Sequence, residues 1–124
     1  MKRAIVLFGH GSRDPAWRRP MDAVAAAIAQ RSSDVAATCA FLELSQPDLP
    51  TAVAELAARG TSRIAVLPLF LGVGAHARQD LPRLVEEARR RCPSVRIDVA
   101  AAAGEHPEVV DLLAELALRS VSKE

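Results

Sequence analysis

The sequence predicts an α/β fold with a doubly wound, four-stranded parallel sheet in the order 2-1-3-4 and helices on both faces. The first observation is that short apolar runs alternate with amphipathic stretches of helical length, the order that produces parallel strands joined by right-handed crossovers. The second is the run from Arg63 to Phe70, whose continuous apolar content is typical of a strand covered on both faces. Strands one and three are then neighbours, and ligands bind such sheets in the crevice between those strands' carboxyl ends.

Length and composition favour a single small domain. The chain has 124 residues, half of them apolar, and a chain of this size buries roughly two-thirds of its unfolded surface without disulfides or metals. We expect one domain over residues 1–120 and a frayed tail over residues 121–124. Cys39 and Cys92 have no metal-finger or redox spacing and are expected to be reduced thiols. Because the chain has neither a signal-peptide core nor an apolar run of membrane-spanning length, the expected location is the cytoplasm.

The charge balance argues against two classes of partner. Sixteen basic and fifteen acidic residues give a net charge of +1, which provides no overall field for nucleic acid or a membrane surface. All but two of the basic residues are Arg, whose guanidinium makes two-point contacts with carboxylates and phosphates. The alternative explanation for this excess of Arg is a biased genomic composition. Neither nucleic acid nor a membrane is therefore an expected partner.

The first strand is predicted over Arg3–Gly9, and a cluster of turn residues follows it. His10 therefore stands at the carboxyl end of a strand. A helix is predicted from about Trp17 or Pro20 to Arg31, with apolar residues at helical spacing on one face. Trp17 is expected to pack at the entry of this helix, and the alternative is a stacking platform for a flat ligand.

The second strand is predicted over Val35–Leu42, with Glu43 at its end. The next helix runs from Leu49 or Thr51 to Arg59, and it stops at Gly60, a residue type common just past a helix end. Glu43 thus lies at the same edge of the sheet as His10.

The third strand, Arg63–Phe70, leads into a glycine-containing loop that carries His76. Asp80 is predicted to cap a helix over Leu81–Arg91, with Pro82 in the first turn, where a missing N–H has no cost. His76 is therefore expected in a loop at the carboxyl end of a central strand.

The fourth strand is predicted over Val95–Ala100. Its apolar and charged residues alternate, as is typical of an edge strand with one solvent-exposed face. The last helix is predicted from about Glu108 to Arg119. Its expected buried stripe consists of Val109, Leu112, Leu113 and Leu116. His106, beside a proline at the start of this helix, is expected to have a capping role rather than a catalytic one.

His10 and His76 come from neighbouring strands, which lie about 4.8 Å apart in a sheet, so both side chains can reach one small volume. Glu43 leaves the strand on the other side of strand one. Two imidazoles and a carboxylate form a ligand set for a divalent first-row metal with open positions, and imidazole also accepts protons near neutral pH. The alternatives are a turn or cap role for His10, a surface loop position for His76 and a solvated rim charge for Glu43.

Several activities are disfavoured by absent motifs. The sequence contains no P-loop for ATP, no G-x-G-x-x-G opening the first helix and no G-x-S-x-G around Ser12. Gly9-His10-Gly11 is similar to the Arg-His-Gly signature of histidine phosphatases, but Phe8 stands where that signature has its phosphate-binding Arg. A phosphatase with this sequence would therefore lack the Arg that binds the substrate phosphate.

The ordered motifs of the chain resemble those of the short CbiX-type sirohydrochlorin chelatases. The motifs span most of the chain and are Gly9-His10-Gly11-Ser12-Arg13, Phe41-Leu42-Glu43, Pro68 to His76, Asp80 to Pro82, and Gly104 with His106-Pro107. The resemblance implies an enzyme that inserts a divalent metal into a reduced tetrapyrrole without ATP. It also implies that His10 and His76 hold the metal and accept pyrrole protons, with Glu43 as the accompanying carboxylate.

The resemblance further implies how the macrocycle is bound. The loop lining it would be Leu71, Gly72, Val73, Gly74 and Ala75, together with Gln46. Glycines in that loop would let a flat ring approach the backbone closely. Arg13 and Arg78, next to the two histidines, would grip the carboxylates at the ring's edge, although Arg is also common on ordinary surfaces.

The metal, the partner and the reaction class remain predictions from this resemblance. Co²⁺ is the first choice of metal, with Fe²⁺ and Ni²⁺ as alternatives, since imidazole and carboxylate accept all three. The alternative to catalysis is a non-catalytic tetrapyrrole or metal carrier that uses the same edge. A homodimer is expected, because one sheet edge covers one face of a broad ring. Its contact is expected at Leu81–Arg91 and the loops after Gly9 and Phe70.

Overall fold

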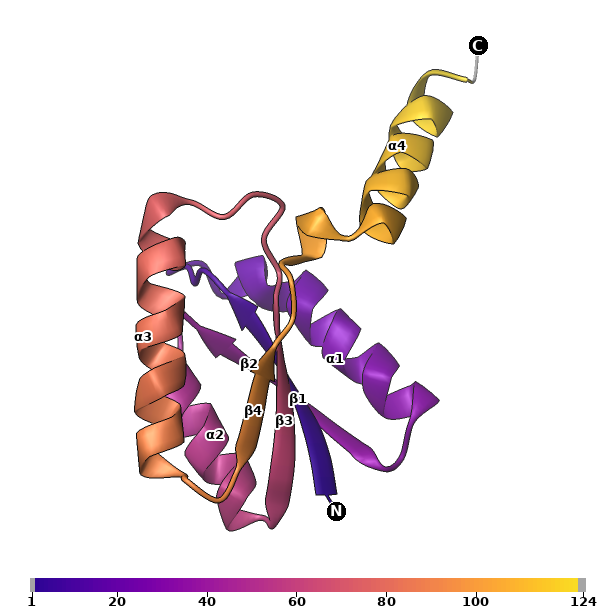
Figure 1. Ribbon diagram of the computed structural model, residues 1–124. Coiled ribbons are helices and arrows are strands. Elements are labelled where there is room, and N and C mark those ends of the chain that lie inside the picture. Colours follow the sequence, from indigo (N-terminus) through magenta and orange to yellow (C-terminus); the bar gives the residue numbers. More distant parts are fainter. Residues whose placement is uncertain (1, 123–124) are drawn as a thin grey trace.

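The computed structural model describes residues 2–122. Four strands form one sheet in the order β2-β1-β3-β4, and every neighbouring pair is parallel (Figure 1), as predicted. The strands are β1 (Lys2–Gly9), β2 (Val35–Phe41), β3 (Thr61–Pro68) and β4 (Arg96–Val99). The register pairs Phe8 of β1 with Ala40 of β2 and Pro68 of β3, so the carboxyl ends of β2, β1 and β3 lie at one edge.

The helices cover the two sheet faces unequally. They are α1 (Arg19–Arg31), α2 (Leu49–Ala58), α3 (Ala75–Arg91) and α4 (Pro107–Val121), with short 3-10 turns η1 (Pro15–Arg18) and η2 (Ala103–Glu105). Figure 1 shows α1 on one face of the sheet and both α2 and α3 on the other. No helix within residues 2–122 is long and apolar enough to span a bilayer.

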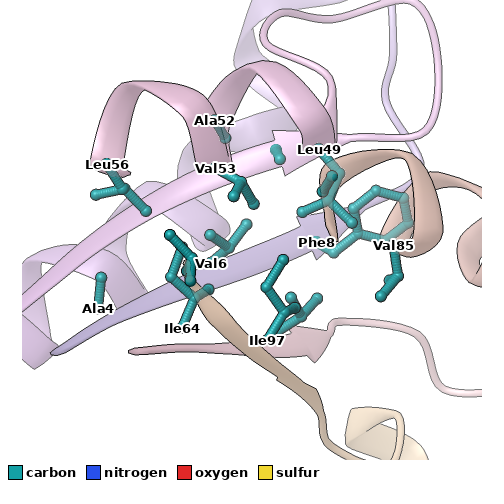
Figure 2. Close-up of a cluster of buried hydrophobic side chains, with 14 residues drawn as sticks. Ala4, Val6, Phe8, Leu49, Ala52, Val53, Leu56, Ile64, Val85 and Ile97 are labelled. Atoms are coloured by element: carbon teal, nitrogen blue, oxygen red, sulfur yellow. The ribbon is translucent and has the colours of Figure 1, made fainter. Parts of the chain in front are cut away.

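The main core lies between the sheet and the α2/α3 layer. Alternate residues of β1 point into it, and Val6 and Phe8 are fully buried against Leu49 and Val53 of α2 (Figure 2). Phe8 also meets the ring of Phe70 edge-on, with centroids 6.0 Å apart. Each fully buried side chain of this size contributes about 1.5–3 kcal/mol, so this layer anchors the strands that carry the site.

A smaller core lies under α1. Leu7, Met21, Cys39 and Phe41 are buried there. Burial, followed by the nearby Asp22 carboxylate, raises the pKa of the Cys39 thiol, and both cysteines are free thiols, as expected. The expected packing of Trp17 at the helix entry is confirmed, because its ring lies tilted against Phe41 with centroids 6.2 Å apart.

The third helix starts earlier than predicted. It begins at Ala75 instead of Leu81, and Gly74 rather than Asp80 precedes its first turn. Pro82 therefore lies inside the helix, where it removes one backbone hydrogen bond. The preference of proline for first turns suggested the later start. The consequence for the site is that His76, expected in a loop, belongs to the first turn of α3.

The predicted burial of the last helix is wrong. None of the residues of α4 is buried, and the expected core stripe is exposed, with Leu112 at 52%, Leu113 at 42% and Leu116 at 46% of full exposure. Figure 1 shows α4 projecting beyond the sheet, attached through η2. Periodicity identifies an apolar helix face but does not say what covers it. The helix also includes Val121, predicted as tail, while the predicted tail residues 123–124 lie outside the described residues.

Candidate active site

The two predicted histidines line one hollow at the carboxyl edge of the sheet. His10 directly follows β1, and His76 follows β3 through the loop that begins after Pro68. The hollow has a volume of about 260 Å³. Its lining consists of His10, Phe70, Gly72, Gly74, Ala75, His76 and Ala77. Strand adjacency and the glycine loop together therefore bring two imidazoles, 66 positions apart in sequence, to the same small volume.

Glu43 joins His10 at this edge. Its Oε2 atom lies 3.4 Å from Nε2 of His10, an ion pair whenever the imidazole is protonated. The two side chains are 52% and 56% exposed, and solvent-exposed pairs of this kind are worth about 0–1 kcal/mol. Such a weak pair can open to admit a metal ion or a ligand.

The backbone explains why Glu43 lies beside His10. The amide of Glu43 donates a 3.0 Å hydrogen bond to the carbonyl of His10, and the amide of Leu42 donates to that of Gly9 at 2.9 Å. Gly11 has φ of +105°, and a Cβ there would overlap with the carbonyl group of Glu43. Only glycine allows this approach, so Gly11 holds the loop after β1 against the loop after β2.

A pair of serines that the sequence did not reveal joins the loop after β1 to the loop after β2. Ser45 Oγ accepts a 3.1 Å hydrogen bond from the amide of Ser12 and donates a 2.9 Å bond to the carbonyl of Ser12. Both residues occur in clusters of turn-forming residues, and that composition alone does not reveal a partner 33 positions away. The reciprocal contact limits how far the Glu43 loop can move from His10.

The loop that leads to His76 is anchored at its base. Phe70 accepts a 2.8 Å hydrogen bond from the amide of Gly104 in η2, and its ring packs on Phe8. A Cβ on Gly104 would overlap with the backbone of Leu71. No atom lies within 4 Å of where a Cβ would stand on Gly72 or Gly74, so the loop presents open backbone to a ligand.

Of the other predicted binding residues, only Ala75 is among those that line the hollow. Leu71, Ala75, Arg13 and Arg78 are exposed, and Val73 is half-buried. Gln46 is exposed, and its carbonyl accepts a 3.4 Å hydrogen bond from Arg18. Among residues 2–122, neither Arg13 nor Arg78 forms an ion pair, so both guanidinium groups are available to an anionic ligand.

His106 lies outside the hollow. Its backbone precedes α4, but its ring does not cap the helix. The ring Nε2 atom lies 2.8 Å from the carbonyl oxygen of Ala101. This bond ties the segment after β4 together, a structural role different from the expected cap.

The acidic and imidazole groups form an open arrangement rather than a closed cage. Within the described part of the chain, no three His, Cys, Asp or Glu side chains converge tightly enough to hold a metal ion. Structural zinc sites, by contrast, use four converging protein ligands. The close pair of His10 and Glu43, with His76 on the wall of the same hollow, instead suits an ion that is held briefly and then released.

Comparisons with known proteins agree on one family. A sequence profile of the CbiX family matches residues 4–120. The chain is 36% identical over 97 residues to a sirohydrochlorin cobaltochelatase of Methanosarcina acetivorans, covering 78% of this chain and 75% of the relative. It is also 36% identical over 110 residues to a sirohydrochlorin ferrochelatase of Bacillus subtilis, covering 89% of this chain but 42% of that longer protein.

Solved structures have the same fold. A putative cobalamin biosynthesis CbiX protein from Marinobacter aquaeolei superposes with a TM-score of 0.84 at 27% identity, covering 98% of this chain and 99% of the other. The sirohydrochlorin chelatase SirB from Bacillus subtilis subspecies spizizenii, in complex with cobalt, gives a TM-score of 0.81 at 32% identity. The match covers 98% of this chain and 52% of that protein.

Proposed function

The chain belongs to the CbiX family, and from this premise we propose that it is a chelatase that inserts Co²⁺ into sirohydrochlorin, with Fe²⁺ and Ni²⁺ as alternative metals. The observation that carries the proposal is the pairing of His10 with Glu43 beside a hollow that His76 also lines. The relatives include both a cobaltochelatase and a ferrochelatase. Imidazole and carboxylate bind all three ions, so the choice of Co²⁺ is tested by experiment.

Metal insertion requires that two pyrrole N–H protons leave as M²⁺ enters the ring. In the proposed mechanism His10 and His76 hold the ion through neutral imidazole nitrogens, helped by Glu43. Once the ring nitrogens take the ion, each imidazole has a free lone pair and can accept a pyrrole proton. The Glu43 carboxylate, 3.4 Å from His10, stabilises the imidazolium that results, and the exposure of His10 lets the proton pass on to water.

The energy for insertion comes from replacing a few weak protein ligands with four ring nitrogens. No nucleotide is needed for this exchange, in agreement with the absence of a P-loop in the sequence. A closed four-ligand site would retain the ion. The open arrangement of His10, Glu43 and His76 instead leaves coordination positions free for the ring.

The loop Leu71–Ala75 and Gln46 are proposed to contact the ring. Gly72 and Gly74 present backbone on which a flat ring can lie, while the exposed Arg13 and Arg78 are proposed to bind its carboxylates in two-point contacts. The hollow of about 260 Å³ is smaller than the roughly 300–1,000 Å³ of sites that enclose a ligand. We therefore propose a homodimer in which a second copy covers the other ring face, with α3 and the loops after Gly9 and Phe70 as the expected contact.

The test is metal insertion by the purified protein with sirohydrochlorin and each of the three metals. His10→Ala and His76→Ala should each lower the rate about 10²-fold or more, the usual range for a positioned proton acceptor, while circular dichroism shows an intact fold. His106→Ala is the matched control, because its ring lies outside the hollow, and it should keep the wild-type rate. Wild-type insertion rates in both site variants would contradict the assignment.

The same assay separates catalysis from the alternative, a tetrapyrrole or metal carrier. A carrier needs only contacts with its ligand, whereas two titratable imidazoles at one hollow suit proton transfer. Tight ring binding without any rate enhancement over the spontaneous reaction, for all three metals, would establish the carrier instead.

A further inference from the structure

The turn that follows Glu43 has an unusual backbone conformation. Leu44 has φ of +65°, and within residues 2–122 it is the only residue other than glycine with a positive φ. The amide of Ser45 donates a 2.8 Å hydrogen bond to the carbonyl of Glu43, so these three residues form a γ-turn with Leu44 at its centre. A γ-turn whose central residue has positive φ is the rare and strained form, and a bulky side chain makes this conformation still less favourable.

The Leu44 side chain itself does not account for this strained conformation. It is 53% exposed, and it is not among the residues that line the hollow, so neither core packing nor the wall of the hollow requires it there. A strained backbone persists only where the surrounding structure holds it, and such positions gather at functional sites. The functional group next to this strain is the carboxylate of Glu43.

The γ-turn fixes the direction in which the Glu43 side chain leaves the backbone. The amide of Glu43 donates a 3.0 Å hydrogen bond to the carbonyl of His10, and the carbonyl of Glu43 accepts the bond from Ser45. Because both peptide groups are held, the Cα–Cβ bond has one orientation, and the carboxylate lies 3.4 Å from Nε2 of His10. Among residues 2–122 the carboxylate forms no other ion pair. A half-exposed side chain with a single weak partner depends on its backbone for its position.

The Ser45 side chain holds the far end of the γ-turn. Its hydroxyl oxygen accepts a 3.1 Å hydrogen bond from the amide of Ser12 and donates a 2.9 Å bond to the carbonyl of Ser12, and both serines are half-buried. The next backbone anchor along the loop is the carbonyl of Pro47, which accepts a 3.0 Å bond from the amide of the buried Phe41. Without the Ser45 hydroxyl, Leu44 could relax to a negative φ, and that relaxation would move the peptide group that it shares with the preceding residue.

We propose that Ser45 is a positioning residue for metal binding: it holds the strained turn at Leu44 against Ser12 and so keeps the Glu43 carboxylate beside His10. A ligand that is already in place loses less conformational freedom when an ion binds, so the strain at Leu44 is offset by tighter binding of the ion. Ser45 itself does not touch the ion and acts only through Glu43. This role rests on the proposed metal site and adds the residue that orders one of its ligands.

Calorimetric titration with Co²⁺ alone tests this role without relying on turnover. Ser45→Ala should raise the Kd for Co²⁺ about ten-fold, the lower end of the usual loss when a group that orients a metal ligand is removed. Glu43→Ala should raise it at least as much. When Ser45→Ala is added to Glu43→Ala, the Kd should change by less than about two-fold, because a residue that acts only through the carboxylate has no further effect once the carboxylate is gone.

A second substitution should reverse the loss, and a matched serine serves as control. Glycine adopts positive φ without the steric penalty that leucine has, so Leu44→Gly in the Ser45→Ala background should recover about five-fold in Co²⁺ affinity. A role of Ser45 in general stability predicts no such recovery, because glycine adds flexibility to the loop. The control is Ser62→Ala, which removes a 3.4 Å bond to the carbonyl of Lys2 at the amino end of β3 and should leave the Kd unchanged. Circular dichroism checks that every variant is folded.

The positioning role and the chelatase activity can fail separately. If the Co²⁺ titrations give the expected pattern but the wild-type protein does not insert the ion into sirohydrochlorin, the chelatase assignment fails and the role of Ser45 stands. Wild-type Co²⁺ affinity in folded Ser45→Ala or in Glu43→Ala would overturn the positioning role. So would an equal loss from Ser45→Ala with and without Glu43, or the absence of any recovery with Leu44→Gly.

Discussion

Gly104 offers a test of whether the position of the Leu71 loop determines activity. Substitution by Ala would place a Cβ 2.5 Å from the carbonyl carbon of Leu71, whereas ordinary contacts begin at 3.4 Å. The atoms that would clash with the new Cβ are backbone atoms of Leu71, so rotating a side chain cannot relieve the overlap. The loop must therefore move away from η2 by about 1 Å, a shift that reaches Gly74 and His76 through a short connection.

The expected effect of Gly104→Ala follows from that displacement. A misplacement of about 1 Å at a catalytic geometry can cost about 10²-fold in rate, so metal insertion should fall between ten-fold and a hundred-fold. Overpacking costs typically 1–3 kcal/mol, and loss of the 2.8 Å bond from Gly104 to Phe70 adds about 1 kcal/mol. The free energy of unfolding should therefore also drop measurably.

The assay compares steady-state insertion kinetics and urea unfolding for Gly104→Ala and a control, Gly60→Ala. Gly60 has φ of +92° and lies before β3 at the opposite edge, where a Cβ would meet only the Lys2 side chain. The control should lose about 1–2 kcal/mol of stability from backbone strain while keeping its activity. Wild-type kinetics in folded Gly104→Ala, or equal activity losses in both variants, would show that the position of the Leu71 loop does not control metal insertion.

Two further predictions concern the ring contact and a helix cap. Gly72→Ala should leave stability nearly unchanged, because no atom lies within 4 Å of the new Cβ. It should raise KM for the tetrapyrrole about ten-fold, because the methyl group would keep a flat ring from the backbone. An unchanged KM in the insertion assay would count against that contact. Asp48 is the N-cap residue of α2, and its Oδ1 accepts a 2.9 Å hydrogen bond from the Thr51 amide, which lowers the pKa of the carboxyl. Asp48→Ala should cost about 1 kcal/mol at neutral pH, and chemical unfolding should show the difference shrinking as pH falls through that lowered pKa, whereas Asp48→Asn should retain most of the cap.

The sheet and the residues of the candidate site could be predicted from the amino-acid sequence alone. Continuous apolar runs, the turn residues after them and Gly60 define where strands and helices occur, because these signals are local and the backbone responds to them locally. The strand order follows from connection rules. Strand adjacency then brings His10, Glu43 and His76 to one edge without any knowledge of side-chain packing.

What covers each apolar face, and how close the site residues come to one another, could not be predicted without the three-dimensional structure. The stripe of α4 looked like a core stripe because periodicity carries no information about the partner surface. The contact of Ser12 with Ser45 and the approach of Gly104 to Leu71 join segments far apart in sequence. His76 belongs to α3 because the helix continues through Pro82, a position where local propensity argues for a break. Such features depend on long-range packing. Packing overrides a local conformational preference when the free energy gained from burial exceeds the cost of the unfavourable local conformation.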